Sequence, residues 1–163
     1  MNFKLFLPYL VVAAVAGAAI VTGLLFAFSN FMMRALAELD PEHGIYAMQK
    51  INEKIINPTF LFFFLGTPLV CLLIAIYSAS NFGDTQSVLL LLGSIGYIVG
   101  PFGITVRCNV PLNDKLAEVQ PKEGADVWKD YQVRWQRWNH IRTYIGLISI
   151  VILCLGLSYT PSL

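Results

Sequence analysis

RWQRWNHIRT, residues 134–143, stands directly before a segment without charge that extends to Leu163. A polar and aromatic cluster therefore precedes an apolar segment of roughly 20 residues, the length that a membrane-spanning helix needs. If the stretch is helical, Trp135, Trp138 and Arg142 recur at spacings of three and four, so they share one face. The pattern predicts a helix with a polar cluster at the point where it enters the membrane.

The polar residues of this stretch have two interpretations. Tryptophan and arginine together are typical of the interface between a membrane and water. Asn139, His140 and Arg142 lie deepest in the expected span, where polar groups need partners and are functional by default. We therefore expect Arg142 to be buried near the mouth of a helix bundle, within reach of Asn109 or a polar group of the first loop, rather than to face lipid.

The composition of the whole chain is that of an integral membrane protein. Of its 163 residues, 56% are hydrophobic and 13% are charged, and the mean hydropathy is +0.65. Four segments carry no charge: residues 5–33, 55–83, 85–106 and 143–163. We predict a single all-α membrane domain over residues 1–163, a four-helix antiparallel bundle with spans at about 5–35, 57–79, 86–107 and 137–160.

The charged residues are concentrated in the first and third loops. All of them except Lys4 and Asp84 lie within residues 34–54 or 107–142. The two loops are expected at one end of the bundle, each with a short amphipathic helix, and the positive-inside rule places them in the cytoplasm. Residues 48–52 and 135–139 share a pattern of large apolar, Gln, cation, large apolar and Asn, which also allows two parallel helix-hairpin repeats.

Small residues predict where the spans approach one another closely. Ala19, Gly23 and Ala27 recur every fourth residue in the first span, and Gly96 and Gly100 stand in G-x-x-x-G spacing in the third. Such faces allow helix backbones to come together in a membrane. Pro101, directly after the second pair, predicts a bend in the third span.

Charge and motifs argue against several classes of function. A net charge of +1 gives no reason to expect a nucleic-acid partner. His43 and His140 stand far apart and form no H-x-x-x-H or E-x-x-H pair, so we predict no metal site. The sequence contains no phosphate-binding loop, nucleophile elbow or dinucleotide fingerprint. His140 remains as an acid–base group, flanked by cations that could stabilise an anion.

Polar and aromatic residues from the ends of the spans and from both charged loops are expected to meet at one mouth of the bundle. Helix bundles build ligand sites from facing side chains in this way. For Asn30 and Asn52, hydrogen bonding between helices is the favoured explanation. The candidate site consists of Asn30, Asn52, Arg107, Asn109, Asn113, Trp135, Trp138, Asn139, His140 and Arg142.

Four motifs carry a resemblance to a known family. They are Phe28-Ser29-Asn30-Phe31-Met32-Met33, Ala47-Met48-Gln49 with Asn52, Asn109-Val110-Pro111-Leu112-Asn113, and Trp135 with Trp138-Asn139-His140 and Arg142-Thr143. Together they are similar to the anthrone-oxygenase-like family of small four-helix membrane proteins, most of them bacterial, which implies a bacterial inner-membrane location. Some fungal members oxidise polyketide anthrones with molecular oxygen and no recognised cofactor, so the resemblance implies no cofactor. By motif it points to Asn109, Asn113, Trp138, Asn139, His140 and Arg142.

Two functions are compatible with these residues. The first is an intramembrane, cofactor-free oxygenase or related acid–base enzyme acting on a lipophilic aromatic, such as an anthrone, phenol or quinone. His140 would be the base, Arg142 would stabilise the enolate oxygen, and Asn109 would orient it. The second is a non-catalytic membrane protein that binds a lipid or quinone or scaffolds a partner, and a homo-oligomer is compatible with either. The residues expected to bind substrate are Asn30, Asn52, Arg107, Asn113, Trp135, Trp138 and Asn139.

Overall fold

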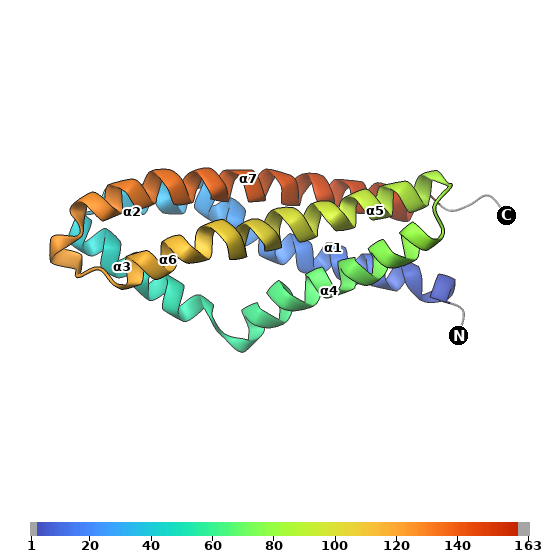
Figure 1. Cartoon of the computed structure of the whole chain (residues 1–163), viewed down its shortest axis with the longest axis horizontal. Coiled ribbons are helices and arrows are strands. Elements are labelled where there is room, and N and C mark those ends of the chain that lie inside the picture. Colours follow the sequence, from blue (N-terminus) through green and yellow to red (C-terminus); the bar gives the residue numbers. More distant parts are fainter. Residues whose placement is uncertain (1–2, 160–163) are drawn as a thin grey trace.

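Four long helices run through the computed structural model, which describes residues 3–159 (Figure 1). The first joins α1 (Phe3–Ala27), the π-helix η1 (Phe28–Met32) and α2 (Met33–Ala37), and the second is α4 (Pro58–Ser80). The third joins α5 (Thr85–Tyr97), the π-helix η2 (Ile98–Asn109) and α6 (Val110–Ala117), and the fourth is α7 (Ala125–Ser158). Each is long and apolar enough to cross a membrane. The predicted all-α, four-helix membrane bundle is confirmed.

The four helices form a ring in which each contacts two antiparallel neighbours. α1 packs against α4 and α7, and α5 packs against the same two helices. Figure 1 shows the start of α1, the end of α7 and the α4–α5 turn at one end of the bundle. α2, α3 (Pro41–Ile55), α6 and the short 3-10 helix η3 (Pro121–Glu123) lie at the other end. The two charged loops therefore meet at one end, where the site was expected.

Apolar side chains divide between the interior and the outer surface of the bundle. The interior of the bundle, toward the end that carries the α4–α5 turn, is filled by a cluster that includes Cys71, Leu90 and Leu153. Phe62 and Ile148 remain more than half exposed on the outside. A helix that is apolar on its inner and outer faces alike is typical of a membrane span.

Glycines allow α5 and η2 to approach α7 closely. A Cβ atom added at Gly93 would lie 2.8 Å from Cγ of Leu153, and one added at Gly96 would lie 2.6 Å from Oγ of Ser149. Both distances are too short for real atoms, so the two backbones can be this close only where the side chain is a hydrogen. The contact predicted from Gly96 and Gly100 is confirmed.

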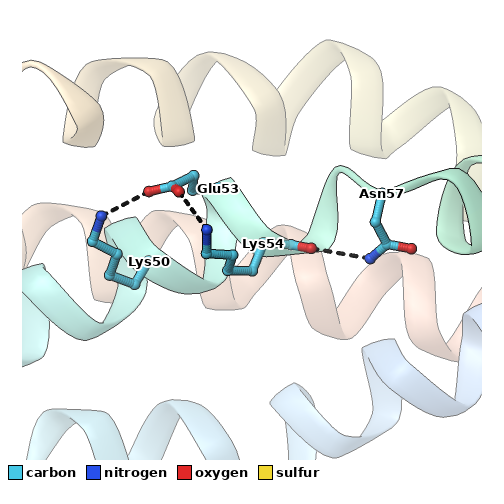
Figure 2. Close-up of polar contacts among 4 residues, drawn as sticks. All are labelled: Lys50, Glu53, Lys54 and Asn57. Carbon is cyan, nitrogen blue, oxygen red and sulfur yellow. Dashed lines mark hydrogen bonds and ion pairs between the residues drawn. The ribbon is translucent and has the colours of Figure 1, made fainter.

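The helix in the first loop is α3, and it ends in an exposed cluster of charges. It begins at Pro41, as the Asp40-Pro41 pair indicates, although the Asp40 side chain makes no capping hydrogen bond. Figure 2 shows its last turn, where Lys50 and Lys54 each donate a 2.8 Å hydrogen bond to Glu53. These hydrogen bonds lower the pKa of Glu53 to about 2. The cluster faces solvent and takes no part in the site described below.

The first and third long helices both become π-helical as they approach the charged end. Hydrogen bonds in a π-helix join residues five apart, one more than in an α-helix. η1 and η2 therefore change which residues face the interior, and Pro101, where a bend was expected, lies inside η2. η1 has 5 residues and is the kind of single-turn π segment often found at functional sites. η2 is longer, with 12 residues, and both segments contact α7.

Candidate functional site

Arg142 is the centre of a polar cluster inside the bundle. Only 4% of its surface is exposed. Its Nε–H and Nη2–H groups donate to Oδ1 of Asn139 at 3.1 and 2.8 Å, and its Nη1–H donates to Oγ1 of Thr105 at 2.6 Å. Its guanidinium carbon lies 5.1 Å from the ring centre of Trp135. The predicted burial is confirmed, but the partner on the third long helix is Thr105 rather than Asn109.

Asn139 connects this cluster to the first long helix. Its Nδ2–H₂ group donates to the Leu25 carbonyl at 2.9 Å and to Oγ of Ser29 at 2.8 Å. The backbone carbonyl of Asn139 accepts a 2.6 Å hydrogen bond from the Thr143 hydroxyl. The side-chain oxygen of Asn139 accepts from Arg142. This one fully buried side-chain amide therefore links α1 and η1 to the arginine on α7. The arginine in turn reaches η2.

Asn109 and Asn113 hold α7 against η2 and α6. Asn109 Nδ2–H donates to the Trp135 carbonyl at 3.1 Å, whereas its buried Oδ1 has no partner within residues 3–159. Asn113 Oδ1 accepts from the Trp135 indole N–H at 2.8 Å and from the Tyr131 hydroxyl at 2.9 Å. Thr105 and Asn109 are four residues apart, so the wide turn of η2 leaves them close to one face.

The tryptophans expected to stack a substrate are part of the protein core. Trp135 is 3% exposed, and its ring packs against Tyr131, whose ring in turn stacks on Trp128. Trp138 is half-buried and packs against the same cluster. With Arg142 also over its ring, Trp135 has no free face for a ligand in this conformation.

His140 lies outside the interior cluster and lines a groove on the outer side of the bundle. The groove has a volume of about 670 Å³ and runs between α2 and α7, and this volume is within the range of small-molecule sites. The His140 ring stacks on Tyr144 with ring centres 6.5 Å apart, and its buried Nδ1 has no hydrogen-bond partner in the described part of the chain. The lining residues are Met33, Arg34, Ala37, Gln132, Val133, Gln136, Arg137, His140, Ile141 and Tyr144.

The charged side chains that line the groove are two arginines. Arg34 and Arg137 line it, no acidic residue does, and neither arginine takes part in an ion pair within residues 3–159. Arg134, three residues before Arg137, is instead paired with Asp130 at 3.3 Å. An anion formed in the groove would therefore meet two arginines that no carboxylate neutralises.

Gln136 is a groove residue that the sequence analysis did not select. Its Nε2–H₂ group donates to the backbone carbonyls of Phe28 and Ser29 at 3.1 and 3.3 Å, which ties α7 to η1. Its Oε1 is buried and unpartnered among the described residues. The available signal was its position four residues before His140, which places both on one face of a helix.

The remaining predicted residues neither line the groove nor bond to Arg142. Asn30 and Arg107 are exposed, whereas Asn52 is half-buried and lies beside Tyr131 in the interior. None of these three lines the groove, and none of them bonds to Arg142. The single site predicted from the sequence is thus divided by α7 into an interior cluster around Arg142 and an outer groove around His140.

Comparison with known proteins assigns the chain to a family. A family model described as anthrone oxygenase matches residues 59–152, more than half of the chain. The matched segment contains Asn109, Gln136, His140 and Arg142. No curated protein and no solved structure matches the chain. The chain belongs to the anthrone oxygenase family.

Proposed function

We propose that the protein is an intramembrane oxygenase that binds a lipophilic aromatic substrate, such as an anthrone, in the groove between α2 and α7. The observation that supports this most directly is the placement of His140. This residue lies in a large, mainly apolar groove beside two arginines without acidic partners. A flat apolar molecule could enter from the lipid and place an acidic C–H near the imidazole.

His140 acts as the general base in this proposal. Its neutral imidazole removes a proton from the carbon between the two aromatic rings of the anthrone, and the resulting charge spreads onto the carbonyl oxygen as an enolate. Arg34 and Arg137 stabilise that oxyanion. Arg142, with its N–H groups on Asn139 and Thr105, maintains the packing of α7 rather than contacting the substrate.

Molecular oxygen completes the reaction. The electron-rich carbanion reduces O₂ and forms a carbon–oxygen bond, which gives a peroxide that takes a proton from the imidazolium. Loss of one water from this hydroperoxide creates the second carbonyl. Overall, one anthrone and one O₂ give one anthraquinone and one water, and the electrons come from the substrate itself.

The test measures O₂ uptake and anthraquinone formation from anthrone by the protein in lipid vesicles. His140→Ala should lower the rate by about 10²–10⁴-fold, the usual share of general-base catalysis. His43→Ala is the matched control, because His43 is an exposed histidine of α3 and should leave the rate unchanged. If wild type binds anthrone but oxidises it no faster than His140→Ala, the protein is a lipophile-binding protein and the oxygenase proposal is wrong.

A further inference from the structure

Two polar atoms without partners lie one helical turn apart beside the groove. They are Oε1 of Gln136 and Nδ1 of His140, and both are buried. Residues four apart on a helix face the same side and can form hydrogen bonds with each other. A buried polar atom that forms no hydrogen bond is destabilising, so two such atoms on one face of α7 point to an interaction that forms under other conditions.

The orientation of the Gln136 amide decides what that interaction can be. Its nitrogen donates to the carbonyls of Phe28 and Ser29, at the beginning of η1, and only the nitrogen end of an amide can do so. Its oxygen is consequently the end left to interact elsewhere, and it can only accept. An unprotonated Nδ1 is also an acceptor, and two acceptors cannot bond to each other. A proton on Nδ1 of His140 converts the pair into a donor and an acceptor.

We infer that Gln136 is a positioning residue, which holds His140 in the tautomer that carries its proton on Nδ1. The lone pair of Nε2 is then free to take the substrate proton. This inference rests on the proposed function, in which His140 is the base. The Nδ1–H···Oε1 hydrogen bond is absent from this conformation, as is common for catalytic hydrogen bonds before the substrate binds.

The same hydrogen bond also stabilises the protonated form of His140. When His140 has taken the proton, both of its ring nitrogens are donors, and the Nδ1–H group is buried on the side away from the substrate. Gln136 Oε1 gives that group an acceptor, in the role that a third residue plays beside the base of a catalytic triad. η1 contributes indirectly, because its carbonyls fix the amide that orients the base.

The test reads the tautomer directly by NMR of protein labelled with ¹⁵N-histidine. The spectrum is recorded at about pH 8.5, where an ordinary histidine is neutral, and His43→Ala identifies the signals of His140. Wild type should show protonated Nδ1 and unprotonated Nε2. Gln136→Met keeps the length of the side chain but removes the acceptor, so the proton should move to Nε2.

Kinetics with anthrone provide the second readout. Gln136→Met should lower kcat at least about tenfold and change KM less than about threefold, because the base is misoriented while the groove persists. Gln49→Met is the matched control, because Gln49 also donates to two backbone carbonyls, those of Leu116 and Val119, but does not line the groove. It should change neither the tautomer nor kcat.

The outcomes separate this inference from the proposed function. Wild-type His140 with its proton on Nε2 would overturn the role of Gln136, whatever the rate of anthrone oxidation. A proton on Nδ1 that moves in Gln136→Met would support that role even if wild type does not oxidise anthrone, in which case only the oxygenase proposal fails. Because the wild-type tautomer is read without any change at Gln136, an unstable Gln136→Met protein does not prevent a decision.

Discussion

Arg142 remains charged inside the bundle through neutral partners. Its hydrogen bonds go to an amide oxygen and a hydroxyl, and within residues 3–159 it belongs to no ion pair. A hydrogen bond to a charged group contributes roughly 1.5–3 kcal/mol, so the three bonds offset part of the cost of removing the cation from water. The planar guanidinium reaches Asn139 and Thr105 together, and the two residues lie on different helices.

Replacing Arg142 with lysine should destabilise the protein. Lysine lacks the planar fork that reaches both partners, so at least one charge-assisted hydrogen bond is lost, at about 1.5–3 kcal/mol each. Thermal unfolding in detergent, followed by tryptophan fluorescence, measures the change. Arg137→Lys is the control, because Arg137 is exposed on the same helix and its replacement should leave stability nearly unchanged. Equal destabilisation in the two variants would contradict this account.

At the scale of elements, the contact between α5 and α7 depends on glycine, whereas the face predicted on the first helix does not form. A Cβ at Gly93 would meet both the side chain and the backbone nitrogen of Leu153, at 2.8 and 3.1 Å. Gly23 has no atom within 4 Å of such a Cβ, so the predicted close-packing face of Ala19, Gly23 and Ala27 is wrong at its centre. The first helix instead buries Ala14, Ala18 and Thr22.

These two glycines form a matched pair for mutation. Gly93→Ala should lower the free energy of unfolding by about 1–3 kcal/mol, the usual cost of overpacking, because the Leu153 backbone cannot move aside. Gly23→Ala adds the same methyl group in open space, and the higher helix propensity of alanine should leave stability unchanged or raised by up to about 1 kcal/mol. Unfolding in detergent compares them, and a Gly93→Ala protein as stable as Gly23→Ala would show that the helices are not in close contact.

At the scale of the whole molecule, the two ends of the bundle differ in charge and in the polar side chains that they carry. The groove and the interior cluster lie toward the end that carries α2, α3 and α6, and the α4–α5 turn lies at the opposite end (Figure 1). A substrate dissolved in the membrane would reach the groove from the side, because the groove opens between α2 and α7.

Cysteine labelling can test this arrangement in cells. In a background without the three native cysteines, Asp84→Cys and Lys122→Cys place a single thiol at opposite ends of the bundle. A membrane-impermeant maleimide should label position 84 in intact cells and position 122 only after the membrane is opened, because the positive-inside rule places loops 1 and 3 in the cytoplasm. Labelling of both positions from the same side would contradict the four-span topology.

The fold was largely predictable because membrane insertion depends on local properties of the chain. A long segment without charged residues identifies a membrane span, and the helical period of 3.6 residues predicts that Trp135 and Arg142 share one face. The same period separates His140 from that face. His140 and Arg142 were nevertheless predicted in one site, because both have reactive polar groups and stand two residues apart.

The candidate site was only partly predictable, because helix type and helix partners are not local properties. The exposure of Asn30 and the contact of Thr105 with Arg142 both involve π-helical segments, through which an α-helical pattern does not hold. Gln136 acquires its orientation from carbonyls more than a hundred residues earlier in the chain. Neither segment of the sequence alone predicts such hydrogen bonds.

By itself, the sequence determined that four apolar helices cross a membrane, that the two charged loops lie together, and that Arg142 is buried. Each of these depends on hydrophobicity and on the helical period of 3.6 residues, and both properties are visible within a single segment of the sequence. Only the tertiary structure decided that Arg142 bonds to Thr105 and Asn139, and that His140 and Gln136 share an outer groove. Those choices depend on which helices become neighbours and on the rotation that η1 and η2 introduce, and both arise only when the bundle packs.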